Sequence, residues 1–228
     1  MKLFFKQNGF YLFVYVLVLA VLGYILLHHG KVQIHLVINA WVGNPVWDSF
    51  FKYITHVGDG LVAFIIAFVL LFVNVRKSVY ILASYLGAAV ISSFLKYVLY
   101  PDTFRPHATF GYFIRDFKLH EVEGVEMASI RSFPSGHALS SFALFFCLMF
   151  MTKNQALKAL FFLLAFISSF SRLYLSQHWL IDVYVGSMIG VSFSLLFYAV
   201  FYNSNDPRFA RLNTTLPKLI EERKQKRV

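Results

Sequence analysis

A short stretch near the C-terminal end of the chain places a cation, an imidazole and a carboxylate between two long apolar runs. Arg172 ends the first run, and His178 and Asp182 begin the second. His178 and Asp182 are four residues apart at an expected helix start, so their side chains lie one turn apart on one face. A carboxylate that accepts a hydrogen bond from one ring nitrogen fixes the tautomer and leaves the other nitrogen free for nucleophilic attack. A structural His–Asp pair that caps the helix fits this spacing equally well.

Arg172 follows Ser171 at the very end of an apolar run. A charge inside or beside a bilayer is costly and marks function by default. The planar guanidinium can donate to two phosphate oxygens at once, so it suits recognition of a phosphate group. The alternative is an arginine that simply extends from an apolar helix to the membrane surface, which is a common arrangement.

The sequence Phe133-Pro134-Ser135-Gly136-His137 has the features of a helix start that binds an anion. Pro134 suits the first turn of a helix, and Gly136 lets the backbone approach a ligand closely. Free N–H groups at a helix start bind anions, the Ser135 hydroxyl adds a donor, and His137 can protonate a leaving oxygen. An ordinary helix start with a histidine at the membrane surface is the competing interpretation.

Two further cations precede this motif. Lys96 lies at the end of an apolar run, and Arg105-Pro106 follows in the next link. Each cation alone is most simply a solvated base at the membrane surface. Together with Arg172, however, they can surround one dianion, with His178 and His137 on opposite sides of it. The combination predicts a phosphoryl-transfer site in which one histidine attacks and the other protonates.

These motifs resemble those of the type 2 phosphatidic acid phosphatase family of membrane lipid phosphatases. The family pattern is Lys-x6-Arg-Pro, Pro-Ser-Gly-His and Ser-Arg-x5-His-x3-Asp. The second and third motifs match Pro134–His137 and Ser171–Asp182 without change, whereas eight residues rather than six separate Lys96 from Arg105. The motifs span residues 96–182, and the helical layout extends the resemblance to most of the chain.

The resemblance implies a role for each of these residues. His178 is the nucleophile and forms a phosphohistidine, Asp182 orients it, and His137 protonates the leaving oxygen. The phosphoryl oxygens are held by Lys96, Arg105, Ser135, Gly136 and Arg172. No cofactor is implied. Because the motifs include no carboxylate cluster for a divalent cation, we expect a reaction that is independent of metal ions.

The composition indicates where such a site must lie. Of the 228 residues, 58% are hydrophobic and only 14% are charged, and the mean hydropathy is +0.63. Soluble domains carry about 25% charged residues, so this chain has too little charge for a water-facing surface. The apolar runs are continuous, which indicates an all-α polytopic membrane protein rather than a barrel. The net charge of +10 lies in short links and in the tail, where it suits lipid headgroups better than nucleic acid.

Six membrane spans fit the hydropathy, and they form one transmembrane catalytic domain over residues 1–228. The predicted spans cover 10–28, 57–74, 79–99, Pro134–Met151, 157–175 and 179–202. Gly186 and Gly190 in the last span are spaced for close helix packing. A short amphipathic segment, Val32–Val42, follows the first span, and a basic tail at 203–228 ends the chain.

Six spans place both termini on one side of the membrane. The basic residues expected on this side are Lys2, Lys6, Arg76, Lys77, Lys153, Lys158 and those of the tail. The positive-inside rule makes this side cytoplasmic. The links 29–56, 101–133 and 172–178 then lie outside. We therefore expect a site that faces the periplasm or the exterior, in a bacterial inner membrane.

The leading hypothesis is a phosphatase that acts on a lipid phosphate or pyrophosphate. The resemblance offers undecaprenyl pyrophosphate, phosphatidylglycerol phosphate, phosphatidic acid and lipid A phosphates as substrates. The link 107–133 could shape this choice through Arg115, Lys118 and Arg131, although a merely solvated loop fits at least as well. The alternative is a non-catalytic protein that binds or transports an anionic lipid, but this needs no oriented neutral imidazole. Vanadate-dependent oxidation, as in related haloperoxidases, fits poorly with six spans.

Overall fold

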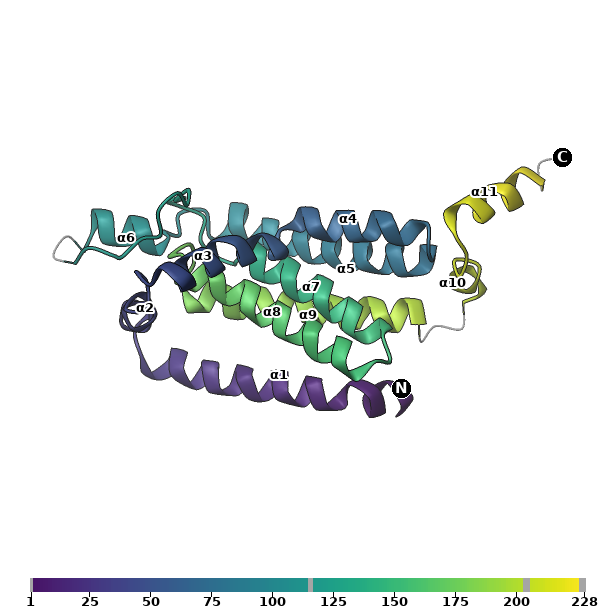
Figure 1. Ribbon diagram of the computed structural model, residues 1–228, viewed down its shortest axis with the longest axis horizontal. Coiled ribbons are helices and arrows are strands. Elements are labelled where there is room, and N and C mark those ends of the chain that lie inside the picture. The colour runs from purple at the N-terminus through teal and green to yellow at the C-terminus, as the bar shows by residue number, and fades with distance from the viewer. Residues whose placement is uncertain (1, 115–116, 203–205, 226–228) are drawn as a thin grey trace.

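The computed structural model describes residues 2–114, 117–202 and 206–225, and its secondary structure in these ranges is entirely helical. The all-α prediction is therefore confirmed. The long helices run side by side along the long axis of the molecule (Figure 1). They are α1 (Lys2–His28), α4 (Gly60–Leu71), α5 (Val75–Phe94), α7 (Gly136–Met151), α8 (Gln155–Tyr174) and α9 (Leu180–Tyr202).

Shorter helices gather at the two ends of this bundle (Figure 1). One end carries α2 (Lys31–Asn39), α3 (Pro45–Ile54) and α6 (Pro106–Tyr112). The other end carries α10 (Pro207–Ala210) and α11 (Leu216–Gln225), and α1 begins there. A short 3-10 helix, η1 (Thr55–Gly58), joins α3 to α4. The predicted amphipathic segment Val32–Val42 thus covers α2 and the turn after it, and a second helix follows.

Polar side chains mark where three of the long helices begin. Asn74 precedes α5, Asn154 precedes α8 and Ser135 precedes α7, and each accepts a hydrogen bond from N–H groups of the first turn. Such caps satisfy donors that have no partner within the helix. α7 therefore begins at Gly136, and Pro134, predicted in its first turn, lies just before the capping residue.

Four helices of the described chain are long and apolar enough to cross a membrane: α1, α8, α9 and α5 together with its extension η2 (Leu95–Leu99). α3, η1 and α4 form a fifth candidate, which is bent by 52° before Gly60. α7 has only 16 residues and is a shorter apolar helix. Each predicted span coincides with a helix, whereas the count of six stays a prediction.

α7 forms the centre of the bundle. It is buried along nearly its whole length from Ala138 to Phe150 and packs against α5, α8 and α9. α9 approaches it closely at Gly186 and Gly190. A Cβ added at Gly186 would lie 2.6 Å from the backbone oxygen of Ser135, and one added at Gly190 would lie 2.6 Å from that of Leu139. The predicted close packing is confirmed. It fixes the start of α7 against α9, and both helices carry candidate catalytic residues at this point.

The end of the bundle near the termini differs from its prediction at one residue. Lys158 is predicted as a basic residue at the membrane surface, but its side chain is fully buried. Its ammonium donates to Asn8 of α1 and, over 2.9 Å, to the backbone oxygen of Met149. A buried lysine needs such partners because an unpaired charge is costly to bury. The burial ties α1 to the bundle at this end.

The described part of the tail also packs on the bundle. The first N–H groups of α5 donate to its backbone oxygens, from Val75 to Thr214 over 2.8 Å and from Arg76 to Leu212 over 2.9 Å. Helix starts leave such donors without a partner of their own. Residues 206–214 therefore close the start of α5.

Candidate active site

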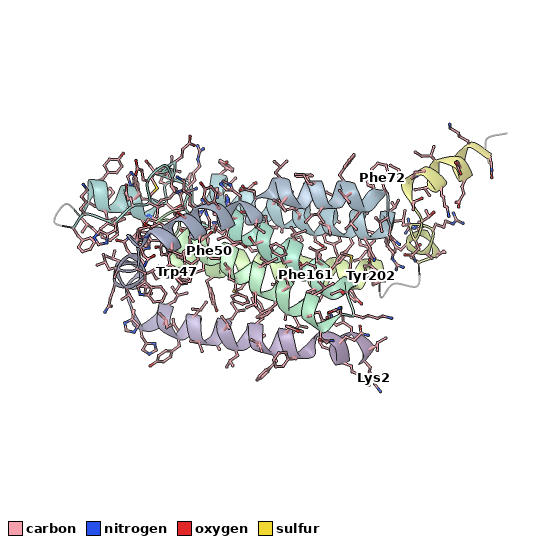
Figure 2. The ribbon with its side chains drawn as sticks, in the orientation of Figure 1. Lys2, Trp47, Phe50, Phe72, Phe161 and Tyr202 are labelled. Atoms are coloured by element: carbon pink, nitrogen blue, oxygen red, sulfur yellow. The ribbon has the colours of Figure 1, made fainter. Side chains whose placement is uncertain are left out.

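The predicted site residues converge at the end of the bundle that carries α2, α3 and α6. Four segments supply them: the end of α5, the link before α7, the start of α7 and the turn between α8 and α9. Figure 2 shows Trp47 and Phe50 of α3 at this end, whereas Lys2, Phe72 and Tyr202 lie toward the other. Residues far apart in the sequence thus share one end of the molecule.

Asp182 is the centre of a buried hydrogen-bond network. One of its carboxylate oxygens accepts from the Nδ1 of His178 over 3.3 Å, from the backbone N of Trp179 over 2.9 Å and from the hydroxyl of Ser132. His178 and Asp182 are each 2% exposed. Several donors hold the carboxylate in place, so it can orient the imidazole firmly.

The two ring nitrogens of His178 have different surroundings. Nδ1 faces Asp182, and this contact assigns its proton to Nδ1. Nε2 then carries the free electron pair, and the Nη1 of Arg105 lies 3.4 Å from it. Burial lowers the pKa of His178 to about 3, so the ring is neutral near neutral pH. The guanidinium can hold a phosphate group, and the free nitrogen of the neutral imidazole is then placed to attack its phosphorus atom.

A tight turn explains the spacing between Arg172 and His178. The backbone oxygen of Arg172 accepts hydrogen bonds from the N–H groups of both Gln177 and His178, over 2.9 and 3.2 Å. Ser176 within the turn has a φ of 54°, in the left-handed region. The chain therefore reverses from α8 to α9 in five residues, and His178 returns to the end of α8.

α2 supports this turn through two residues that were not predicted. The Nε2 of His35 lies 3.1 Å from the Ser176 hydroxyl, and the amide of Asn39 lies 3.4 Å from the same oxygen. Burial lowers the pKa of His35 to about 4, so this ring is also neutral. Asn39 further exchanges two hydrogen bonds with the backbone of His120. α2 thus joins the turn to the link before α7.

The guanidinium groups of Arg105 and Arg172 use only some of their N–H donors in hydrogen bonds within the protein. Arg105 donates from Nη1 to the backbone oxygen of Gln177 over 3.1 Å and to its side-chain oxygen over 3.2 Å. Arg172 donates from Nη1 to the Thr55 hydroxyl of η1 over 2.9 Å. Its Nε is buried and has no hydrogen-bond partner among the described residues. Burial lowers the pKa of Arg105, but an arginine stays charged.

Lys96 joins the two arginines despite the longer spacing of its motif. It lies in η2, a five-residue π-helix that extends α5. It is close enough to Arg105, Arg172 and Asp182 to interact with their charges. π-helical turns are frequent at functional sites. The three predicted cations are thus near enough to influence one another electrostatically.

His137 forms a second histidine–carboxylate pair. Its Nε2 lies 2.5 Å from one carboxylate oxygen of Asp59, and the other oxygen lies 3.1 Å from the Nδ1 of His56. The side chains of His137 and Asp59 are 29% and 35% exposed, so this pair is partly buried and only partly accessible. His137 interacts with the charges of Arg105 and Arg172, which places it beside the same cations as His178.

The start of α7 supplies backbone donors to this group. Ser135 uses its hydroxyl oxygen to cap α7 and donates its N–H to the backbone oxygen of Asp182 over 3.0 Å. The Ser135 side chain is fully buried. A Cβ added at Gly136 would meet no atom within 4 Å, so the space beside the first turn is open. The N–H groups of Gly136 and His137 have no partner within the helix and suit an anion.

The link before α7 has its own polar features. The Nδ1 of His107 lies 2.5 Å from a carboxylate oxygen of Glu121, and both residues line a cavity of about 410 Å³ with Lys118. The guanidinium of Arg131 lies 4.9 Å from the centre of the Tyr97 ring. Arg115, the remaining predicted base of the link, lies outside the described residues.

Comparison with known proteins identifies the family. The model of the PAP2 superfamily matches residues 77–206, which is more than half of the chain. The chain belongs to the PAP2 superfamily. This is the family that the motifs predicted, and the matched range contains every predicted site residue. No curated protein matches the chain in sequence.

Two solved structures resemble the fold. The crystal structure of Aquifex aeolicus LpxE is 25% identical with a TM-score of 0.62, over 72% of this chain and 92% of that one. The first transmembrane PAP2-type phosphatidylglycerolphosphate phosphatase from Bacillus subtilis is 21% identical with a TM-score of 0.57, over 86% and 96%. The second likeness shows the fold alone.

Sequence reasoning missed the partners of the predicted PAP2 residues. Asp59 pairs with His137, Thr55 binds Arg172, and Ser132 binds Asp182. Asp59 carried one signal, because an acidic residue between two glycines opens an apolar run at Gly58-Asp59-Gly60. Thr55 and Ser132 carried none, since a single hydroxyl residue in a link is ordinary.

Proposed function

We propose that this PAP2 protein is an integral membrane lipid phosphatase, which hydrolyses a phosphate monoester or pyrophosphate on a lipid through a phosphohistidine at His178. One observation carries the proposal. The neutral, buried ring of His178 is oriented by Asp182, and its free Nε2 faces Arg105. Binding an anion requires only cations, whereas an oriented neutral nucleophile serves covalent catalysis.

In the first step, Nε2 of His178 attacks the phosphorus atom. The bond from Nε2 to phosphorus forms as the bond to the lipid oxygen breaks. Arg105, Arg172 and Lys96 stabilise the charge on the phosphoryl oxygens together with the N–H groups at Gly136. Asp182 stabilises the positive charge that develops on the His178 ring.

His137 supplies the proton that the leaving oxygen needs. The negative charge of a bound phosphate favours the protonated form of this ring. After the lipid alcohol leaves, the neutral His137 can take a proton from water, which then attacks the phosphohistidine. The bond from phosphorus to Nε2 breaks, inorganic phosphate leaves, and both histidines return to their starting forms. Asp59 holds the His137 ring during both steps.

We further propose six spans, with α3 to α4 and α7 counted beside the four long helices. Lys2 and the basic tail lie at one end of the bundle, and the site lies at the other (Figures 1 and 2). The positive-inside rule makes the first end cytoplasmic. The site then faces the periplasm or the exterior and acts on a lipid of the outer leaflet of a bacterial inner membrane.

The substrate that we propose is one of the phosphorylated lipids that the family resemblance implies. Undecaprenyl pyrophosphate, phosphatidylglycerol phosphate, phosphatidic acid and lipid A phosphates are the candidates. His107, Lys118 and Glu121 line a polar cavity in the link, where a headgroup can be distinguished. The cations of the chain stabilise the phosphoryl oxygens, so we expect excess chelator to leave the activity nearly intact.

The proposal is tested by phosphate release from these lipids in detergent. Wild type should release inorganic phosphate from at least one lipid, and His178→Ala should be slower by about 10⁴-fold or more, as expected for loss of a nucleophile. Circular dichroism and the elution volume of the variant show whether it folds. Equal rates for wild type and His178→Ala would refute catalysis. Binding of the lipid without turnover in wild type would support the non-catalytic alternative.

A further inference from the structure

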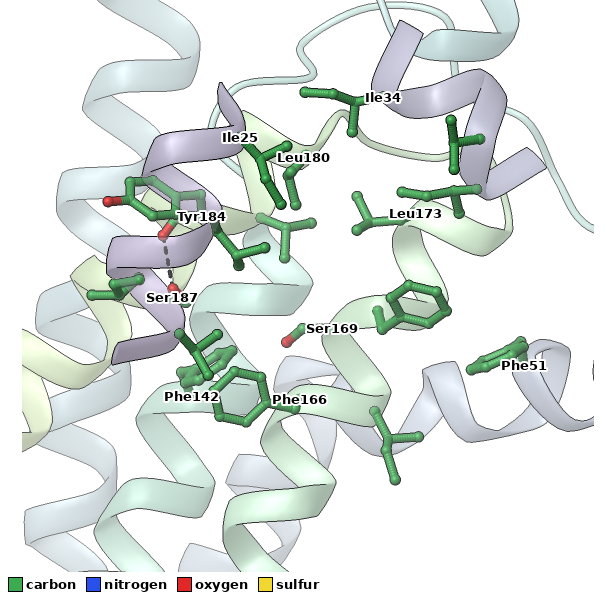
Figure 3. Close-up of a pocket in the computed structure, with 18 of the residues that line it drawn as sticks. Ile25, Ile34, Phe51, Phe142, Phe166, Ser169, Leu173, Leu180, Tyr184 and Ser187 are labelled. Carbon is green, nitrogen blue, oxygen red and sulfur yellow. Dashed lines mark hydrogen bonds between the residues drawn. The ribbon is translucent and has the colours of Figure 1, made fainter. Parts of the chain in front are cut away.

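A large apolar cavity lies between α1 and the rest of the bundle (Figure 3). Its volume is about 860 Å³, and α1, α2, α3, α7, α8 and α9 all contribute to its walls. The labelled wall residues in Figure 3 include Ile25 of α1, Phe166 and Leu173 of α8, and Leu180 of α9. The described walls include none of the candidate catalytic or phosphate-binding residues. The cavity is therefore separate from the phosphate site.

The N-terminal half of α1 is joined to the bundle by polar contacts, whereas Leu22, Ile25 and Leu26 of its outer half pack on it through apolar contacts. Asn8 binds Lys158, Tyr11 donates to the backbone oxygen of Gln155 over 3.1 Å, and the Tyr15 hydroxyl lies 3.2 Å from that of Ser187. Beyond Tyr15, no side-chain hydrogen bond within the described chain joins α1 to another helix. Only 6% of the apolar window of α1 is buried, less than for any other long span.

Such a space does not stay empty. The space is a partly open groove rather than an enclosed void, so molecules that surround the helices can enter it. Water does not fill an apolar cavity that offers it few polar partners. α1, α8 and α9 are each long and apolar enough to cross a membrane, where lipid hydrocarbon surrounds such helices. The occupant that suits the cavity is therefore a hydrocarbon chain.

Two polar features indicate which kind of chain enters. The hydroxyl of Ser169 is buried, has no hydrogen-bond partner among the described residues, and points into the cavity (Figure 3). Ser169 lies about 7.5 Å below the end of α8 at Tyr174, at a rise of 1.5 Å per residue. An ester oxygen can lie at this depth below the membrane surface. His29 and Gln33 line the cavity beside the turn from α1 to α2, at the level of a headgroup.

We infer that this cavity binds one acyl chain of a bilayer phospholipid that is not the substrate. The Ser169 hydroxyl donates to an ester oxygen of this lipid, and its headgroup lies beside His29 and Gln33. The lipid fills the space between α1 and α8, so it holds the outer half of α1 in place. The inference does not rest on the proposed phosphatase activity.

The test is photocrosslinking of the full chain in nanodiscs of phosphatidylglycerol and phosphatidylcholine. A small fraction of the phosphatidylcholine carries a diazirine on one acyl chain. After irradiation, mass spectrometry should map crosslinks to cavity-facing residues such as Leu22 and Phe166, at higher yield than to Leu17 and Leu163, which face outward. Equal yields on the two faces, or crosslinks confined to the outer face, would overturn the inference.

Two variants test the same site by filling it. Leu22→Trp places an indole in the cavity, and Leu17→Trp is the matched control on the outer face of the same helix. Each buried methylene contributes about 0.8 kcal/mol, so displacing even two should lower the crosslink yield at the remaining cavity residues about tenfold. Ser169→Phe fills the cavity from α8 and should act like Leu22→Trp. Unchanged yields in both filling variants would contradict the proposed site, whatever their phosphatase activity.

Discussion

The two candidate catalytic histidines each pair with a carboxylate, and the surroundings of the two pairs differ. His178 and Asp182 are each 2% exposed, and further hydrogen bonds from Ser132 and Trp179 fix the carboxylate. His137 and Asp59 are about one-third exposed, and in the described chain their carboxylate has one other side-chain partner, His56. The same two functional groups therefore lie in a fully buried setting and in a partly exposed one.

This difference matches the two roles proposed for the histidines. A nucleophile must be neutral and fixed in direction, and burial with a firmly held carboxylate achieves both. An acid that later acts as a base must exchange its proton with water or substrate, so it needs an exposed ring. The setting of each pair, rather than its composition, separates the roles.

Replacing the aspartate of each pair by asparagine should give the largest difference in kcat. Asp182→Asn should lower kcat by about 10³–10⁴-fold, because the amide favours the wrong tautomer of the nucleophile. Asp59→Asn should cost about 10–100-fold, as is typical for a residue that supports a ligand or catalytic group from outside. Phosphate release by the two purified variants measures both effects. Comparable losses would show that the pairs do not differ in role.

His137→Gln should distinguish substrates by their leaving groups. Loss of the acid should slow hydrolysis of an alkyl phosphate lipid by about 10²–10⁴-fold. The leaving oxygen of an aryl phosphate is weakly basic and can depart without a proton. The release of the aryl group in the first turnover should therefore be slowed far less. A burst of aryl alcohol followed by slow turnover is the expected time course. An equal loss for both substrates in the first turnover would argue against His137 as the acid.

The buried pair should also make stability depend on pH, which is the smallest of these effects. The pKa of His178 is about 3 in the folded chain against the ordinary value of 6.5. The unfolded chain therefore binds a proton between these values that the folded chain does not, so stability falls as the pH is lowered below about 6.5. His178→Ala should reduce the slope of Tm against pH between about 4.5 and 6.5. Part of the slope should remain in this variant, because His35 also has a lowered pKa, of about 4. An unchanged slope in His178→Ala would contradict the neutral, buried ring.

The helix positions could be predicted, and candidate site residues named, because both depend on local patterns. Apolar runs located the long helices, and the spacing from His178 to Asp182 placed both on one helix face. Gly186 and Gly190 indicated close packing, which α9 and α7 confirm. A helix start at Pro134 followed from the residue types around it, and α7 begins two residues later, at Gly136.

The rest depends on which segments meet in space. Asp59 and His137 are 78 positions apart in the sequence, and no local pattern relates them. Burial of Lys158 depends on Asn8 of α1, a helix that hydropathy shows only as an apolar run. The cavity beside α1 arises from how one helix diverges from its neighbours. Pairing across the bundle is a tertiary property that hydropathy and spacing do not encode.

The most direct test of the central claim is to trap the covalent intermediate. His137→Gln is mixed with an aryl phosphate that carries radiolabelled phosphorus, quenched, and digested for mass spectrometry, with His137→Gln/His178→Ala as the control. The account predicts an acid-labile, base-stable phosphoryl group on Nε2 of His178 and no label in the control. Labelling of another residue at the same rate, or turnover in the control equal to that of His137→Gln, would contradict it.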